Sequence, residues 1–389
     1  SIYARKTAIN GLKTKSFLFY VPCLAAAVLG LATKQIVAVL PVILFLYEWF
    51  FFRGLDRDWL KKHLPLAGLA ILAVIVLAFF FMDNAPLEKL RDMYARHDFT
   101  MQQRLLTEAG VIIYYVSLLI FPHPARLNID YDFPLSHGLS QPLTSALAIS
   151  ALLCLLFMVV YAGRRDRLLV FAVLWFLVTL AIESSFIGLD LVFEHRTYLP
   201  SVFLFIALAR LACSHIRPQG GLIAVMSLAV VTCSCWVHAR NAVWLSGTRL
   251  WTDAARKSPA KARPYGNLGF SLLMDGEKEK AVAALARGLE LNPSDRDIHN
   301  SIAIAFHLAG DSEKALSHCR TALDLDPGFI EARNTRGFIM RKQGNLVRAA
   351  ACFGRVLKEA PHNFEALMNM GLIEQQQGDM GKALSWFRQ

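Results

Sequence analysis

Apolar residues are distributed unevenly along this 389-residue chain. They form long runs between residues 1 and 238, whereas residues 239–389 mix apolar and charged positions as soluble proteins do. A helix needs about 20 apolar residues to cross the hydrocarbon core of a membrane, and in lipid only a helix satisfies its own backbone. Eight runs predict such helices: 16–33, 35–53, 65–82, 104–121, 143–162, 167–188, 198–213 and 221–238.

The second half of the chain repeats with a fixed period of 34 residues. This is the period of the tetratricopeptide repeat (TPR), a hairpin of two helices, A and B. Four kinds of position keep the period: a proline (259, 293, 327, 361), a glycine (276, 310, 344, 378), an alanine (281, 315, 349, 383), and a small residue (269, 303, 337, 371). Chance does not maintain four positions over four registers, so we expect about four repeats, the last one truncated.

Each periodic position has a physical role in the predicted hairpin. The small residue lets helix A approach helix B closely, and a larger residue on helix B fills the seam (285, 319, 353, 387). The glycine opens the turn between the helices, and the proline follows the end of helix B. The segment 250–259 fits the second helix of an incomplete repeat.

The two patterns together predict an all-α protein: a polytopic bundle of about eight membrane helices followed by a TPR α-solenoid. The expected domains are a transmembrane domain at 1–238, a linker helix and solenoid cap at 239–256, and the TPR array at 257–389. TPR arrays present a concave surface to peptides or partner proteins.

Composition agrees with a membrane protein, because the chain is 55% hydrophobic and only 18% charged. The net charge of +11 does not indicate nucleic-acid binding, since the basic residues cluster at the ends of apolar runs without interleaved aromatics. The seven cysteines show no CxxC spacing and predict neither a metal site nor a disulfide framework. Membrane lipids and a protein partner are therefore the expected contacts.

Basic loops predict the orientation in a bacterial inner membrane. Two clusters, around Arg164 and around Arg210, agree and place the loop 122–142 and everything after residue 238 outside the cytoplasm. The TPR domain is then periplasmic. A third cluster, around Arg57, disagrees with the other two about the side of the membrane by one crossing. The three clusters would agree if the segment 104–121 did not cross the membrane. The basic start of the chain resembles a loop beside a membrane span, so we expect a further N-terminal portion.

The segment VFEHRTYLPS, residues 192–201, concentrates Glu194, His195, Arg196 and Tyr198 between two apolar runs. It is either a plain interhelical loop or a site for an anionic lipid headgroup, because a guanidinium offers the paired donors that a phosphate accepts. Both interpretations stay open on the residues alone.

Other polar residues carry similar alternatives. Lys34 either snorkels at a hairpin or joins the headgroup site. The loop that contains Arg126, Asp130 and Asp132 is a candidate acceptor or polar loop, and its two carboxylates are weak evidence for a metal. Glu183 is either satisfied by a hydrogen bond or part of a polar cavity.

In the repeats, Arg333, Asn334 and Arg336 depart from the apolar pattern of helix A in repeat 3. They could face the concave binding surface of the array. The alternative is an exposed, solvated helix face.

Several stretches, taken in order, resemble bacterial relatives of the animal transmembrane-and-TPR O-mannosyltransferases, which belong to the GT-C class of membrane glycosyltransferases. These stretches are GLATKQIVAVLPVILFLYEWFF (30–51), LNIDYDFPLS (127–136), FEHRTYLPSV (193–202) and the C-terminal array. The resemblance implies transfer of a sugar from a polyprenyl-phosphate carrier to a protein hydroxyl on the extracytoplasmic side. It implies that Arg196, with His195 and Lys34, holds the carrier phosphate, and that the repeats present the acceptor.

The resemblance names no catalytic base, because the acidic loop that supplies it in this class is not in this sequence. Two alternatives to the glycosyltransferase remain. One is a non-enzymatic, membrane-anchored TPR scaffold for envelope or pilus assembly, and the other is an enzyme like the O-antigen ligases or polymerases.

Overall fold

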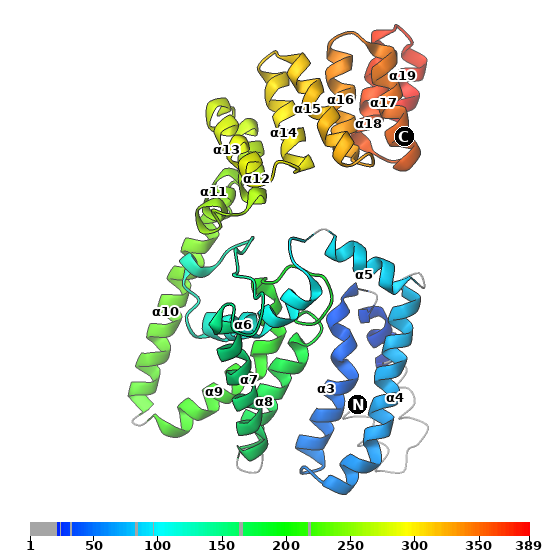
Figure 1. The fold of residues 1–389 in the computed structure, drawn as a ribbon. Coiled ribbons are helices and arrows are strands. Elements are labelled where there is room, and N and C mark those ends of the chain that lie inside the picture. The colour runs from blue at the N-terminus through cyan, green and yellow to red at the C-terminus, as the bar shows by residue number, and fades with distance from the viewer. Residues whose placement is uncertain are drawn as a thin grey trace. The chain divides into compact units, whose positions relative to one another are not determined.

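The computed structural model describes residues 22–23, 25–31, 33–81, 85–95, 97–162, 166–216 and 219–389. In these residues all regular secondary structure is helical (Figure 1). The chain divides into two compact units, one formed by Ser1–Leu127 with Phe133–Trp236 and the other by Asn128–Asp132 with Val237–Gln389. The all-α prediction is confirmed.

The first unit is built from apolar helices linked by short helical turns. Its elements are η1 (Gln35–Val39), α3 (Leu40–Tyr47), η2 (Glu48–Phe52), α4 (Arg57–Phe81), α5 (Pro86–Tyr94), α6 (Met101–Ile120), η3 (Pro124–Arg126), α7 (Leu143–Ala162), α8 (Arg167–Leu180), η4 (Glu194–Thr197), α9 (Tyr198–His215) and the start of α10 (Gln219–Val243). Phe50, Val159, Val170 and Phe171 form a buried core where α8 packs on α3 and α9.

Four helices of the described residues are long and apolar enough to cross a membrane: Arg57–Val76, Met101–Ile120, Glu194–His215 and Gly220–Val243. They correspond to four of the eight predicted spans. The predicted spans 35–53, 143–162 and 167–188 fall on shorter apolar helices, and the run 16–33 lies partly outside the described residues. Arg164 likewise lies outside them.

The prediction of one helix over 167–188 is wrong at its second half. Helix α8 ends at Leu180, and the chain then runs without helix to Phe193. Glu183, Ser184, Ser185 and Gly188 interrupt the apolar pattern here. Backbone carbonyls of this non-helical segment accept hydrogen bonds from two arginines, described below.

The second unit is the solenoid. Its helices are the end of α10, then α11 (Gly247–Lys257), α12 (Ala262–Met274), α13 (Lys278–Leu291), α14 (Arg296–Leu308), α15 (Ser312–Leu325), α16 (Ile330–Lys342), α17 (Leu346–Glu359), α18 (Phe364–Gln376) and α19 (Met380–Phe387). Helices α12, α14, α16 and α18 are the A helices of the four repeats, and each pairs with the B helix that follows it.

The periodic residues have the predicted roles. The four turn glycines adopt positive φ angles between 79° and 87°, a conformation that L side chains rarely adopt. A Cβ on Gly337 would lie 2.8 Å from the ring of Phe353, so the small residue and the large residue do meet at the seam. The segment 250–259 lies largely in helix α11, which packs on α12.

Candidate functional site

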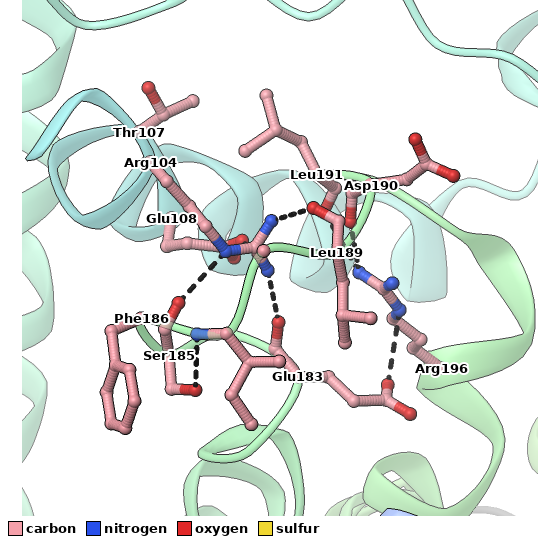
Figure 2. A network of polar contacts seen from close by, with 12 residues as sticks. Arg104, Thr107, Glu108, Glu183, Ser185, Phe186, Leu189, Asp190, Leu191 and Arg196 are labelled. Atoms are coloured by element: carbon pink, nitrogen blue, oxygen red, sulfur yellow. Dashed lines mark hydrogen bonds and ion pairs between the residues drawn. The ribbon is translucent and has the colours of Figure 1, made fainter. Parts of the chain in front are cut away.

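A buried polar cluster lies in the first unit, around Arg104 on helix α6 (Figure 2). Its side chain is 0% exposed and forms an ion pair with Glu108, one helical turn later, at 2.8 Å. Its other donors reach backbone carbonyls of the non-helical segment: Ser185 O at 2.9 Å, Glu183 O at 2.6 Å, and Leu189 O. One guanidinium therefore satisfies three carbonyls that have no helical partner.

Arg196 binds the other end of the non-helical segment (Figure 2). Its Nη1 donates to Asp190 O at 2.7 Å, and its Nε lies 3.4 Å from a carboxylate oxygen of Glu183. The guanidinium also lies over the ring of Phe193. Arg196 is buried, and it gives Glu183 a charged partner, although Glu183 Oε2 receives no hydrogen bond in the described structure.

The other predicted headgroup residues are distributed differently. Tyr198 is 77% exposed and His195 is also exposed, whereas Glu194 is half-buried. Lys34 is exposed immediately before η1. The charged segment thus combines a buried arginine that binds the backbone with exposed side chains before and after it in the sequence.

A cavity of about 360 Å³ lies in the first unit, and none of the four ion-paired residues lines it. Hydroxyl and aromatic side chains line it, among them Thr107, Tyr114, Phe133 and Ser145. Thr107 is the neighbour of Glu108, and its hydroxyl accepts from the backbone N–H of Ser136 at 2.9 Å.

Arg126 and Asp130, predicted together as a polar loop, belong to different units. Arg126 donates to the carbonyls of Ser117 and Phe121 and so caps the end of helix α6. Asp130 is buried in the second unit, where its carboxylate pairs with Lys261 at 3.0 Å and with Arg263 at 2.9 Å.

The hydroxyl of Ser258 binds the segment that contains Asp130. It accepts from Asn128 Nδ2 at 2.9 Å and from the backbone N–H of Asp132 at 3.1 Å, while the Asp132 side chain stays exposed. Residues 128–132 are therefore an integral part of the solenoid unit, which their position in the sequence does not reveal.

The A helices of repeats 2–4 carry a regular stripe of side chains. We call the stripe the A-helix face: an acidic residue (Asp297, Glu331, Glu365), then a position three residues on (Asn300, Asn334, Met368), then an apolar residue (Ile304, Phe338, Leu372). Helices α14, α16 and α18 contact one another in turn, so the three stripes adjoin. The spacings of three and four residues place each stripe on one side of its helix.

Asn334 lies at the centre of the A-helix face. It is 2% exposed, and its Nδ2 donates to Glu365 Oε2 at 3.1 Å and to Asn363 Oδ1 at 3.2 Å. At the other end of the stripe, Arg341 Nε donates to Asn369 Oδ1 at 3.0 Å. Hydrogen bonds thus join the A helices of repeats 3 and 4 directly.

The other two residues predicted with Asn334 do not share its position. Arg333 pairs with Glu359 of helix α17 at 2.8 Å, and Arg336 lies close enough to Cys319 and Cys352 on the B helices to lower their pKa values. Burial outweighs this effect and raises the pKa of Cys319 to about 12. Asn334 and Arg333 are buried and partnered, so neither belongs to an exposed, solvated face.

Metal ligands do not gather in the described residues: no group of three or more His, Cys, Asp or Glu side chains there could hold an ion. The cysteines of the described residues are free, and five of them are exposed.

Comparison with known proteins identifies the repeats. Residues 267–328 and 341–389 match the family model described as tetratricopeptide repeat. Among curated proteins, none matches the chain. The solved structures that it resembles include MamA (16% identity, 36% of this chain and 82% of that chain, TM-score 0.31) and PilF of Pseudomonas aeruginosa (25%, 33% and 58%, 0.31). They also include the first TPR of Spaghetti (RPAP3) bound to an HSP90 peptide (24%, 30% and 94%, 0.29).

The chain therefore carries tetratricopeptide repeats, a protein-interaction module, in its C-terminal part. The family model and the solved structures named above are all those of TPR proteins.

Proposed function

We propose that this protein is a membrane-anchored TPR scaffold that holds a protein or peptide partner on the A-helix face of its repeats. The observation that carries the proposal is the continuous face formed by α14, α16 and α18, whose side chains recur with the repeat period. A periodic surface of this kind suits a partner that extends across several repeats.

The exposed apolar surface of two helices supports the membrane anchor. The apolar windows of the helices at Arg57–Val76 and Gly220–Val243 are not buried inside the protein. Apolar surface of this extent is covered by lipid or by another protein, since water would penalise its exposure. We also propose that the solenoid lies on the extracytoplasmic side of a bacterial inner membrane, which alkaline phosphatase fused after Gln389 would report by its activity.

Photo-crosslinking in intact cells tests the scaffold directly. A benzoylphenylalanine at Met368, which is 40% exposed on the A-helix face, should form an adduct with a partner protein. The matched control is the same substitution at Val347, which is 80% exposed on B helix α17. Equal crosslinking at both positions, or none at Met368, would contradict the proposal.

A second candidate function is transfer of a sugar from a lipid-phosphate carrier. The buried ion pairs Arg104–Glu108 and Arg196–Glu183 support it, because ionisable groups inside an apolar bundle often mark functional sites. We propose that His195, Tyr198 and Lys34 contact the carrier phosphate, and that Arg196 fixes the backbone that presents them.

The test is sugar transfer by the Arg196→Lys variant, with Arg210→Lys as a control at an exposed arginine. Loss of transfer in the first variant only, with insertion and thermal stability retained, supports the enzyme. Unchanged transfer would count against it. Mass spectrometry of the modified acceptor, protein or polysaccharide, separates a protein glycosyltransferase from a ligase-like enzyme.

A further inference from the structure

The acidic row of the A-helix face, Asp297, Glu331 and Glu365, is an unusual environment for carboxylates. Each is the second residue of its A helix, where the helix dipole ordinarily favours a negative charge. Burial nevertheless raises the pKa of Asp297 and of Glu365, and the nearby charge of Glu331 raises both further. The charge of Glu331 therefore acts on the carboxylate of the A helix on either side of it.

Nearby cations do not neutralise the row. Arg296 lies 3.7 Å from Asp297 but is also paired with Asp326, at the end of B helix α15 of the same repeat. Glu331 and Glu365 form no ion pair with any residue that the structure describes. A cation supplied from outside would thus meet at least two carboxylates without a cationic partner.

An unpartnered acceptor lies directly beside the acidic row. Both hydrogens of the Asn334 amide are used, by Asn363 and Glu365, while its buried Oδ1 receives no hydrogen bond in the described structure. Asn300, one repeat earlier, has a buried Oδ1 in the same condition. Buried acceptors are nearly always satisfied, so both Oδ1 atoms retain the capacity to accept a hydrogen bond.

The apolar residues of the face complete the pattern. Ile304, Phe338 and Leu372 follow the asparagine positions on the same side of each helix, and Met368 is exposed beside them. This combination of acceptors, acid and apolar surface suits a polypeptide whose backbone N–H groups are free.

We infer that the A-helix face of repeats 2–4 selects an extended, positively charged segment of the partner. Its Lys or Arg side chains pair with the acidic row, and its backbone N–H groups donate to Asn300 and Asn334. A helical ligand is a poor match, because its N–H groups are used within the helix. The inference rests on the proposed scaffold function and adds the chemistry of the partner.

The expected spacing of basic residues follows from the fold. Packed helices lie roughly 10 Å apart, and an extended chain advances about 3.3 Å per residue. Basic side chains about three residues apart would therefore meet carboxylates on successive A helices.

An acidic partner would have to use the opposite end of the stripe. There Arg341 is buried, donates to Asn369 and lies over the ring of Phe338. Its neighbour Lys342 is exposed, but the corresponding positions of repeat 4 are glutamines, Gln375 and Gln376. Positive charge is thus confined to one repeat, whereas the acidic row extends over three.

The experiment uses the full chain in nanodiscs of zwitterionic phosphatidylcholine, which do not attract basic peptides themselves. The probe is a fluorescent peptide with Lys at every third position and Ser and Leu between. The control peptide carries Glu in place of Lys. Fluorescence anisotropy should show binding of the Lys peptide only, weakening as salt screens the charges.

Variants then locate the contact. Glu331→Gln and Glu365→Gln should each weaken binding of the Lys peptide about two- to fivefold, as expected for exposed ion pairs, and reduce its salt dependence. Glu313→Gln is the matched control, because it removes an equally exposed carboxylate from the first turn of B helix α15. Asn334→Ala should weaken binding without changing the salt dependence.

The inference is overturned if the Glu peptide binds as tightly, if neither peptide binds, or if Glu313→Gln has the same effect as Glu331→Gln. Competition between the Lys peptide and the crosslinked partner distinguishes the failure of this inference from the failure of the scaffold proposal. An adduct at Met368 that still forms when the Lys peptide is present during irradiation would refute the charge preference alone, and absence of the adduct would refute both.

Discussion

The two compact units differ in how far apart in the sequence their contacting buried residues lie. In the solenoid, the seam between Gly337 and Phe353 joins residues 16 positions apart, and every repeat makes the same contact. In the helical bundle, Arg104 donates to the carbonyl of Ser185, which lies 81 positions away, and nothing repeats. The solenoid is thus specified by local pattern and the bundle by unique long-range partners.

This difference predicts where a single substitution is most costly. A repeat spreads its stability over several similar seams, whereas the non-helical segment of the bundle depends on two guanidiniums for its carbonyls. The predictions below test this contrast in order of decreasing expected effect.

Arg104→Met should destabilise the bundle by roughly 3–5 kcal/mol, because it leaves a buried carboxylate without its partner. It also leaves the carbonyls of Glu183 and Ser185 without a donor. Thermal unfolding of the detergent-solubilised protein measures the loss. The double variant Arg104→Met/Glu108→Met removes both charges and should recover part of the stability, and a double variant as unstable as the single one would contradict the ion-pair explanation.

Gly337→Ala should destabilise the solenoid by about 1–3 kcal/mol through overpacking, because the new Cβ would lie 2.8 Å from the Phe353 ring. Phe353→Leu should partly rescue it, as the natural pair Ala303 and Cys319 in repeat 2 suggests.

Gly354→Ala is the matched control, since no atom lies within 4 Å of its added Cβ. Alanine favours the helix over glycine by up to about 1 kcal/mol, so this variant should be more stable than the parent. Urea unfolding of the three variants measures these effects, and equal loss at positions 337 and 354 would refute the seam.

Asp130→Asn should cost the solenoid unit about 1–2 kcal/mol. The carboxylate is buried, but Lys261 and Arg263 are 40% and 50% exposed, so solvent screens part of each ion pair. Hydrogen exchange of α12 measures the loss, with Asp132→Asn as the control at an exposed carboxylate. Unchanged exchange in Asp130→Asn would show that the loop contributes nothing to the solenoid.

The same contrast explains what could be predicted from sequence. The turn glycines and the small–large seam were predictable, because a 34-residue period repeats each constraint four times. The Asn334 position was recognised as polar, but its neighbours Arg333 and Arg336 turned out to face the B helices. A single repeat shows which residues differ, while helix geometry decides which side they occupy.

The polar cluster of the bundle was only partly predictable. The charged segment 192–201 stood out, and Arg104 with Glu108 could have been recognised as an ion pair one turn apart in an apolar run. Their carbonyl partners could not, because no pattern marks which backbone groups lose their helix. The partners of Asp130, Lys261 and Arg263, are likewise more than 130 positions away.

The smallest expected effect is a loss of solenoid stability in mild acid, carried by His318. His299 Nε2 lies 3.0 Å from Pro293 O and its Nδ1 lies 3.0 Å from His318 Nδ1, so a neutral pair satisfies all three groups. Burial, and then the proximity of His299, lower the pKa of His318 below 6.5. As pH falls through 6.5 the unfolded chain binds the proton first, so stability is fully present above this pH and declines below it.

Two carboxylates oppose this trend at lower pH. Because burial raises the pKa values of Asp297 and Glu365, the folded state takes up their protons first and gains stability as the solution becomes more acidic. Because of the histidine pair, hydrogen exchange of α14 and α15, corrected for the intrinsic rate, should accelerate between pH 7 and pH 6. His318→Gln should abolish that step, whereas His362→Gln, at an exposed histidine, should preserve it. If the step survives in His318→Gln, the histidine pair is not its source, and His307 on α14, whose pKa burial also lowers, is the next candidate.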